Sequence, residues 1–509
     1  MSYTPDKKTF LEKASQGNLV PVWRELLADM DSPVSAYDKV REHLRRKDHA
    51  SHTFLLESVE GGENVGRYSF IGGAPRAILR AYGRRVTLQE PGSAEKTIEE
   101  DGDPLDALKR YMARFKPVVN GQLPRFTGGA VGFLGYDCVS FFEKKVPTRS
   151  DNALRAPDMV FMVTDALIIF DRVRHSVRII ANAFIDGSPE KAYDEAIKTI
   201  DLLCAALRTP KSSSMIDSGA YLGEIVPESN TTREEFMATV DKAKEYIRAG
   251  DIIQAVLSQR FETECTADSL DVYRALRSIN PSPYMFCLDL GDSAMVGSSP
   301  EVHVRGEDGH AELRPIAGTR PRSDDPAKDA KLAEELLADP KERAEHIMLV
   351  DLARNDLGRV CKFGTVKVPE LMVIERYSHV MHIVSDVTGE LRPDTDVYEL
   401  MRATFPAGTV SGAPKIRAME IIAELEKAKR GPYAGAVGYF SFGGNLDSCI
   451  TIRTIILDLG KAFVQAGAGI VADSDPNTEY EETRNKARGM FKALALARHF
   501  AAARKAGRK

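Results

Sequence analysis

The segment 465–487 near the C-terminus constrains this chain more than any other stretch, because two glycines, a proline and several carboxylates follow one another closely. It reads as the end of a buried strand, a glycine turn, a short loop and the start of a helix. Gly467 and Gly469 carry no Cβ, so the backbone N–H groups beside them can approach an anion. Pro476 suits the first position of the helix that follows.

The predicted helix carries carboxylates in its first turns. Asp475 or Ser474 is expected to cap it, and Glu479 and Glu482 stand three residues apart on one face. Amide donors beside two carboxylates would suit an anion held together with a hard cation. The alternative is a capped surface helix whose early acidic residues complement the helix dipole.

Length and composition exclude several classes of protein. A chain of 509 residues can bury two or three ordinary domains or one large two-part fold. The net charge of −5 argues against a nucleic acid or an anionic membrane as partner. The six cysteines lack metal or redox spacing, which is typical of reduced thiols in a cytoplasmic protein. No apolar run approaches the roughly twenty residues of a membrane span. We therefore expect a soluble, cytoplasmic protein.

The first part of the chain predicts mainly sheet, and the second part mixes strands with helices. Strands are expected at 19–26, 52–59, 67–71, 77–82, 128–135, 159–170, 252–261, 284–290, 380–387, 435–442, 448–457 and 462–467, and helices at 32–40, 189–207, 232–249, 326–337 and 340–355. The polar, serine-rich stretch 208–215 is the best linker. The pattern predicts an α+β protein with helices outside mixed sheets.

A second pair of glutamates lies on the helix predicted after Pro340. Glu342 and Glu345 are again three residues apart. If this helix faces the one at 476, their carboxylates can offer oxygen ligands to a Mg²⁺ ion that keeps several waters. Glutamates on two exposed helix surfaces are the plainer alternative, although each pair flanks an apolar stretch.

Three further features suggest a small anionic substrate. Arg453 interrupts an apolar strand, where a buried guanidinium needs an anion, unless it lies on the solvent face. His382 is embedded in another strand and suits acid–base work, although a core histidine would look the same. The loop 405–415 is rich in glycine, hydroxyl and proline residues and could cradle an anion, but it lacks the P-loop spacing. These patterns together favour a Mg²⁺-assisted enzyme acting on a small polyanion.

Several of these segments resemble the chorismate-utilising enzymes, and most closely their anthranilate-forming branch. The likeness is strong over 220–500 and weaker before it, through Leu55-Leu-Glu57-Ser58. It rests on motifs in family order at 297–301, 314–320, 345–356, 381–382, 405–415, 453 and 467–486. The resemblance implies antiparallel or mixed sheets packed as a sandwich, a mainly β regulatory part at 1–210 and a catalytic, chorismate-binding part at 220–505.

The resemblance also assigns roles to the acidic residues. Glu345 and Glu482 look like ligands of a Mg²⁺ ion that holds the ring carboxylate of chorismate, with Glu342 and Glu479 as their outer partners. Glu301 looks like the general acid that protonates the departing 4-hydroxyl while ammonia adds at C2. Such an acid needs a raised pKa, which a closed apolar pocket supplies.

Further site residues follow from the same likeness. His382 resembles the histidine needed to eliminate pyruvate and restore aromaticity, and Thr409 of the 405–415 loop belongs with the catalytic group. The residues that resemble carboxylate-binding groups are Gly318, Thr319, Tyr433, Arg453, Gly467, Ala468 and Gly469.

Two positions separate branches of the family. Isochorismate-forming and salicylate-forming relatives place a lysine base where this chain has Gln254, and ammonia needs no such base. Aminodeoxychorismate synthases commonly carry a nucleophilic lysine where this chain has Ala317, which cannot form a covalent adduct. Both differences favour an anthranilate-forming lyase over 4-amino-4-deoxychorismate synthase component I.

The resemblance finally implies partners and regulation. Because no amidotransferase motif is visible, a separate glutamine amidotransferase subunit is expected to supply ammonia, in a heterotetramer, or the chain forms a homodimer. Feedback inhibition by tryptophan is expected at Ser58, Pro283, Tyr284 and Met285. A tryptophan-binding regulator without catalysis is the alternative from another class, and a scaffold protein has no feature in its favour.

Overall fold

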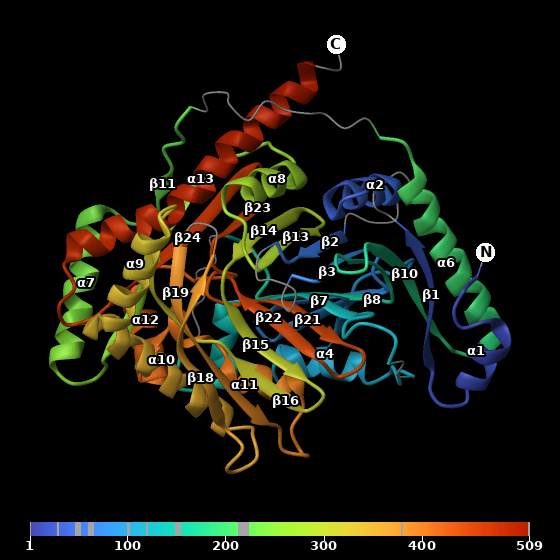
Figure 1. Cartoon of the computed structure of the whole chain (residues 1–509), viewed down its shortest axis with the longest axis horizontal. Coiled ribbons are helices and arrows are strands. Elements are labelled where there is room, and N and C mark those ends of the chain that lie inside the picture. The colour runs from blue at the N-terminus through green and yellow to red at the C-terminus, as the bar shows by residue number, and fades with distance from the viewer. Residues whose placement is uncertain are drawn as a thin grey trace.

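Two large antiparallel sheets form the centre of the molecule, with helices around them (Figure 1). The computed structural model describes residues 2–27, 30–45, 52–59, 66–98, 102–118, 121–147, 154–211, 223–377 and 380–506. Within these ranges each sheet has twelve strands. The α+β class predicted from the sequence is therefore confirmed.

The first sheet joins strands from both parts of the chain. Its order is β1 (Leu19–Leu27), β10 (Ser176–Phe184), β9 (Ala166–Asp171), β3 (Tyr68–Gly73), β2 (His52–Glu57), β13 (Tyr284–Leu290), β14 (Ser293–Ser299), β23 (Thr454–Asp458), β24 (Lys461–Ile470), β12 (Gln254–Glu264) and β11 (Glu228–Ser229), with β20 (Gly412–Ala413) also beside β12. The two parts meet where β2 pairs with β13 and Glu57 lies opposite Met285.

The second sheet is shared in the same way. Its order is β17 (Ile316–Pro321), β19 (Val380–Glu390), β16 (His310–Leu313), β15 (Val302–Glu307), β22 (Leu446–Ile450), β21 (Ala436–Ser441), β7 (Gly129–Leu134), β8 (Met159–Thr164), β4 (Ala77–Tyr82), β5 (Arg85–Gln89) and β6 (Lys96–Ile98), with β18 (Lys367–Arg376) beside β19. Here β21 and β7 join the two parts. The division at 210–220 stays a prediction, and the linker residues 212–215 lie outside the described residues.

Apolar side chains fill the space between the sheets. Phe54 and Phe286 come from the first sheet, Phe133 and Tyr439 from the second, and all four are buried in one cluster. Alternation along each strand sends the neighbouring side chains to the outer faces. The sheets therefore pack as a sandwich, which is the architecture that the resemblance implied.

Helices cover the outer faces of the sandwich. Those that pack against the first sheet or each other on that side are α1 (Lys7–Lys13), α2 (Pro33–Arg45), α6 (Pro189–Arg208), α7 (Arg233–Arg248), α8 (Ser269–Ile279), α12 (Lys415–Leu425) and α13 (Pro476–Ala506). Those on the second sheet are α4 (Pro104–Met112), α9 (Pro326–Ala338), α10 (Pro340–Gly358) and α11 (Val397–Thr404). Short turns at η1 (Tyr136–Cys138), α5 (Val139–Phe142) and η2 (Gly408–Val410) complete the description. None of the helices in the described ranges has the length and apolar character of a membrane span.

The glycine turn expected at 467–469 is wrong, because β24 continues through both glycines to Ile470. The glycines serve close packing instead: a Cβ at Gly467 would lie 2.7 Å from the Tyr433 hydroxyl. The turn follows the strand, and Asp475 caps α13 by accepting the Thr478 N–H at 2.8 Å. Pro476 is the first helical residue, as predicted.

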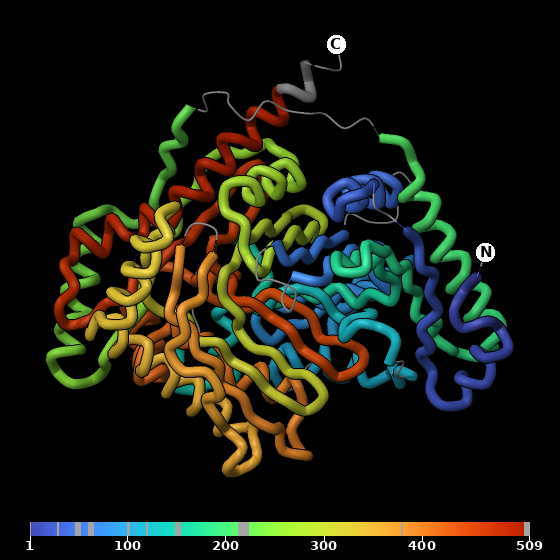
Figure 2. Tube along the Cα trace, viewed as in Figure 1, coloured from blue at the N-terminus to red at the C-terminus, as the bar shows by residue number. Residues whose placement is uncertain are grey.

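The single strand expected at 448–457 is also wrong. The chain leaves the second sheet at the end of β22 and enters the first sheet at β23, so 451–453 is a crossover between sheets. Arg453 ends this crossover with φ of +50°. An unbroken strand could not pass from one sheet to the other, and the apolar character of both flanks concealed the break. Figure 2 shows the C-terminal part of the trace running among segments from the first half of the chain.

Candidate active site

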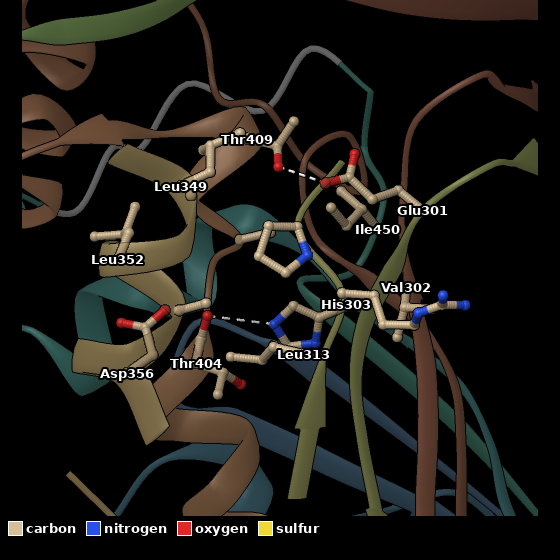
Figure 3. A pocket seen from close by; sticks show the side chains of 15 residues that line it. Glu301, Val302, His303, Leu313, Leu349, Leu352, Asp356, Thr404, Thr409 and Ile450 are labelled. Atoms are coloured by element: carbon tan, nitrogen blue, oxygen red, sulfur yellow. Dashed lines mark hydrogen bonds between the residues drawn. The ribbon is translucent and has the colours of Figure 1, made fainter. Parts of the chain in front are cut away.

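Glu301 lies two residues beyond β14, where the chain passes from the first sheet to β15 of the second. The residue is 6% exposed, and its carboxylate accepts the Thr409 hydroxyl at 2.5 Å (Figure 3). Burial raises the pKa of Glu301 to about 7, although Thr409, Arg453 and Lys486 each act to lower it. A carboxyl group with this pKa can donate a proton near neutral pH.

A cavity of about 40 Å³ opens beside this pair. Its residues come from several elements: Glu301, Val302, His303, Leu313, Arg314, Pro315, Leu349, Leu352, Ala353, Asp356, Thr404, Ala407, Gly408, Thr409 and Ile450. Figure 3 shows Leu349, Leu352 and Asp356 on one helix, α10, with His303 across the cavity. His303 is buried, and its pKa is lowered to about 3, so its ring is neutral. The cavity wall next to Glu301 is therefore largely apolar or uncharged.

Arg453 provides positive charge close to Glu301. Burial lowers the pKa of Arg453, and the neighbouring Glu301 carboxylate opposes that effect. In the described part of the chain its guanidinium has no hydrogen-bond or ion-pair partner, while Arg453 O accepts the Ser298 N–H at 3.1 Å. A desolvated guanidinium without a protein acceptor is suited to an anionic ligand.

His382 is held in one tautomer by β17. Its Nδ1 lies 2.9 Å from Gly318 O and 3.1 Å from Thr319 Oγ1. A carbonyl oxygen can only accept, so Nδ1 carries the proton and Nε2 keeps its lone pair. Gly318 adopts φ of +68° at an irregularity in the strand pairing, which aims its carbonyl at the ring. Burial lowers the pKa of His382, which leaves Nε2 free to accept a proton.

Tyr433 and β24 form another wall of the site. The Tyr433 hydroxyl lies against Gly467, and Gln254 lies so close to Gly469 that its amide would touch a Cβ there. Ala468, between the two glycines, pairs with Leu257 of β12. The three predicted backbone groups therefore lie in strand geometry.

Glu342 and Glu345 lie on α10 as predicted. Arg320 donates to Glu342 at 3.2 Å, and a Cβ at Gly318 would lie 3.0 Å from the same carboxylate. Burial and the neighbouring charge of Glu342 raise the pKa of Glu345, whereas a hydrogen bond from Gln254 lowers it. The α10 pair thus lies next to β17, whose Gly318 contacts His382, and next to β12.

Glu479 and Glu482 lie on α13. Burial and Glu482 raise the pKa of Glu479. Lys341 and Lys486 lower the pKa of Glu345 on α10 and of Glu479 on α13 alike. The two helices therefore present carboxylates to the same pair of lysines. Glu482 itself pairs with Lys486 at 2.7 Å.

These carboxylates have the donor chemistry that a hard divalent cation needs. Glu345 and Glu479 are both partly buried, both have raised pKa values, and both gain from nearby positive charge. Among the residues that the structure describes, however, no three histidine, cysteine, aspartate or glutamate side chains are close enough to hold an ion. The four glutamates fit a cation by type, but they are not gathered into a preformed cage.

The residues predicted to bind tryptophan lie at the junction of β2 and β13. Ser58 follows β2, and Val59 N donates to Ser282 O at 3.3 Å, so Pro283 and Met285 lie beside it. Tyr284 points away from this group: its hydroxyl donates to Asp447 of β22 at 2.9 Å. Alternation along β13 places Tyr284 on the inner face and Met285 on the outer face.

Four residues at the site were not singled out from the sequence. Lys486 donates to Gly467 O at 3.0 Å as well as to Glu482, and its spacing of four from Glu482 was a usable signal. Lys341 follows Pro340 without any such pattern. Arg430 and Glu426 form a largely buried pair next to Tyr433, which no local pattern reveals.

Comparisons with known proteins agree with one another. A family model described as chorismate binding enzyme matches residues 51–492. Anthranilate synthase component 1 from Acetivibrio thermocellus is 49% identical over 486 residues, which is 94% of this chain and 96% of the relative. The protein of that name from Pseudomonas aeruginosa is 48% identical, over 97% of this chain and 99% of its own.

A solved structure gives the same result for the fold. The crystal structure of anthranilate synthase component I from Streptococcus pneumoniae TIGR4 matches with a TM-score of 0.76 and 37% identity, over 92% of this chain and 99% of that one. The match supports the sandwich, and the sequence likeness runs through the residues of the site. The chain therefore belongs to the chorismate-binding enzyme family, and within it to the group formed by the anthranilate synthase component 1 proteins.

Proposed function

We propose that this enzyme converts chorismate to anthranilate by adding ammonia at C2 and eliminating pyruvate, as the first step of tryptophan biosynthesis. The observation that carries the proposal is a buried glutamic acid, Glu301, with a pKa of about 7 beside Arg453, whose guanidinium has no hydrogen bond to a protein acceptor within the described residues. Relatives that are 48–49% identical over almost the whole chain bear the name anthranilate synthase component 1.

The first stage uses Glu301 as general acid. Its Oε proton passes to the 4-hydroxyl of chorismate, and the C4–O bond breaks and water leaves as ammonia forms the C2–N bond. The resulting ammonium group returns one proton to the Glu301 carboxylate. Thr409 fixes the carboxyl group through its hydrogen bond, while Arg453 and the Tyr433 hydroxyl are placed to bind the carboxylates of the substrate. A low-dielectric pocket strengthens each of these interactions.

The side chain at position 254 favours ammonia over water as the nucleophile. The Gln254 amide cannot take a proton from water, and it is already engaged with Glu345. Neutral ammonia has a lone pair of its own and needs no base. Ala317 offers no amine for a covalent adduct with the ring.

The second stage restores the aromatic ring. The proton at C2 leaves, the C3–O bond breaks, and the side chain departs as the enol of pyruvate. His382 is the base for this step, because its Nδ1 proton is held by Gly318 O and its Nε2 lone pair is free. The ring of Tyr377, with its centroid 5.7 Å away, fixes the imidazole from the side.

Glu345 and Glu482 would hold a Mg²⁺ ion, with Glu342 and Glu479 behind them. When bound, the ion draws electron density toward the ring carboxylate as the leaving group departs. The support comes from the raised pKa values of Glu345 and Glu479, which show that their carboxylates lack sufficient neighbouring positive charge. Lys341 and Lys486 lower these pKa values only in part.

Two partners complete the proposal. A separate glutamine amidotransferase subunit supplies ammonia, since the relatives are named as component 1 of a synthase. Tryptophan inhibits the enzyme by binding at the β2–β13 junction, where Ser58, Pro283 and Met285 lie together. This junction joins the two parts of the first sheet and is therefore suited to regulation.

A product assay tests the proposal. Purified protein with chorismate, MgCl₂ and an ammonium salt is expected to yield fluorescent anthranilate and one equivalent of pyruvate. Glutamine in place of ammonium should give no product until an amidotransferase subunit is added. Formation of 4-amino-4-deoxychorismate or isochorismate would assign the enzyme to another branch, and tryptophan binding without turnover would make it a regulator.

A further inference from the structure

A buried ion pair lies directly beneath the candidate active site. Arg430 follows α12, and its side chain is 1% exposed, while that of its partner Glu426 is 8% exposed. Arg430 Nε and Nη2 donate to the two oxygens of Glu426 at 2.8 and 2.7 Å. Neither residue is among those that the mechanism uses.

The first link from this pair leads to the general acid. Arg430 Nη1 donates to Val410 O at 2.8 Å, and Val410 directly follows Thr409, the hydrogen-bond donor to Glu301. Arg430 Nη2 also donates to Val256 O, at 2.5 Å, and so ties the same loop to β12. The guanidinium thus holds the loop that contains Thr409 in place relative to β12.

The second link leads to β24. Glu426 accepts the Ser258 N–H at 2.8 Å and the Ser258 hydroxyl at 2.9 Å. Ser258 lies opposite Gly467 in the β12–β24 pairing, and Gln465 donates to the same hydroxyl at 2.9 Å. The carboxylate therefore anchors the strand at the point where Gly467 faces the site.

The third link leads to Tyr433. The guanidinium carbon of Arg430 lies 5.7 Å from the centre of the Tyr433 ring and 4.5 Å from that of Tyr136. The Tyr433 hydroxyl in turn lies where a Cβ at Gly467 would be crowded, at 2.7 Å. The ring is held between the ion pair below and β24 above.

We propose that Arg430 and Glu426 are positioning residues that fix Thr409, Tyr433 and Gly467 relative to one another for catalysis. Three groups from separate elements must meet one small dianion, and the ion pair connects to each of them. Arg430 bonds to the carbonyl of Val410, next to Thr409, and lies against the Tyr433 ring, while Glu426 bonds to Ser258, which lies opposite Gly467. A lysine at position 430 would keep the charge but could not supply four directed N–H bonds in one plane. The proposal relies on the proposed function for the use of chorismate as substrate and for the role of Glu301 as general acid.

Arg430→Lys tests the proposal through the disappearance of chorismate. We expect kcat/KM to fall roughly 10²-fold, the loss typical of misplacing reacting groups by about 1 Å. Arg41→Lys is the matched control, because Arg41 of α2 is a buried guanidinium, 5% exposed, that pairs with Asp268 and Asp289. This control should lose comparable stability and keep its kcat and KM.

Two further variants separate the links. With Arg430→Lys the Thr409 hydrogen bond weakens, so the pKa of Glu301 rises and the fall of activity with pH moves to higher pH, as it should in Thr409→Val. Arg453 and Lys486, the other groups facing Glu301, stay in place. Ser258→Ala removes the hydroxyl bonds to Glu426 and from Gln465 but keeps the Ser258 N–H bond to Glu426, so it weakens only the link to β24. It should raise KM while leaving that pH limb unmoved.

One outcome overturns the proposal: Arg430→Lys loses stability like Arg41→Lys but keeps the wild-type kcat, KM and pH limb. If Arg430→Lys does not fold, Glu426→Gln replaces it, because the amide keeps the shape of the carboxylate and weakens the bonds to Arg430 and to Ser258. Wild-type kinetics in Glu426→Gln would then reject the proposal. An unexpected product from wild-type protein would reject the anthranilate assignment and still leave this comparison readable, since substrate loss is measured.

Discussion

Glu301 is the residue on which the proposed chemistry depends most, and its surroundings predict how the rate depends on pH. As general acid it must be protonated, and burial raises its pKa to about 7. Activity is therefore expected to fall as pH rises through about 7, where the carboxyl group loses its proton. Glu301→Gln should lower kcat by about 10²- to 10⁴-fold and remove this limb of the pH–rate profile.

Glu307→Gln provides the control for that measurement. Glu307 ends β15, the strand that follows Glu301. Burial raises the pKa of its carboxyl group as well, but Glu307 pairs with Arg125 and is not among the site residues. Its variant should keep the wild-type rate and pH limb. A Glu301→Gln enzyme with an unchanged profile would assign the proton donor elsewhere.

The site residues could be predicted from the sequence where they belong to a motif. The contacts between their side chains could not. Glu301 and Thr409 come from motifs 108 residues apart, yet their side chains share a hydrogen bond. Tyr284 was grouped with Met285 because they are neighbours, but alternation along β13 separates their side chains. Lys486 was not predicted as a site residue, because its sequence neighbourhood does not show that it bonds to both Glu482 and Gly467 O.

Among the elements, α10 and α13 carry the prediction for the metal. Glu345→Ala and Glu482→Ala should each abolish turnover without unfolding the protein, because neither carboxylate supports the core. Binding of Mn²⁺, followed by electron paramagnetic resonance, should weaken in both variants. It should also weaken in wild-type protein as pH falls, since the raised pKa of Glu345 means that its carboxylate is protonated earlier.

Glu334→Ala on α9 is the matched change, because it removes an exposed helix glutamate. Its Mn²⁺ affinity and rate should equal those of wild-type protein. Full activity in the presence of excess EDTA, after removal of bound ions, would contradict the role given to the glutamates of both helices.

The pairing of β2 with β13 predicts how inhibition can be separated from catalysis. Ser58→Ala should relieve tryptophan inhibition while sparing the uninhibited rate. Met285→Ala should do the same and also lower the free energy of unfolding by about 2–5 kcal/mol, because its side chain is buried. Inhibition curves with chorismate and ammonium measure the first effect, and urea unfolding measures the second.

Met162→Ala distinguishes these effects from general loosening. Met162 of β8 is buried in the cluster between the sheets, whereas Met285 is buried on the outer face of the first sheet, so the Met162 variant leaves a similar cavity at a different place. It should lower stability comparably and leave the inhibition curve in place. An unshifted curve in Ser58→Ala would remove the assigned inhibitor site.

Most elements could be predicted from local pattern, and the exceptions have physical causes. The helices at 189–207, 326–337 and 340–355 and the Thr232 cap agree with α6, α9, α10 and α7 to within a few residues. The glycines of β24 were read as a turn because close backbone packing leaves the same signature as a bend. The break at 451–453 depends on a change of sheet, which no local sequence signal records.

At the scale of the whole molecule, the two sheets interleave both parts of the chain. Each sheet is completed by one pairing between the parts, β2 with β13 and β7 with β21, and residues more than 200 positions apart meet there. Local periodicity gives the strands but not these pairings, so the sandwich could be inferred only from the family resemblance. The first sheet also connects the β2–β13 junction directly to β14, which leads into Glu301.

This arrangement predicts that the catalytic part does not work alone. A fragment of residues 220–509 would leave the edges of β13 and β21 unpaired and would uncover the apolar interior around Phe286 and Tyr439. We expect it to aggregate or to bind a hydrophobic dye, with no turnover of chorismate. Co-expression with residues 1–215 should restore soluble, active protein, because the fragment then supplies β2 and β7. A soluble and active 220–509 fragment would instead support two independent domains with the boundary predicted from the sequence.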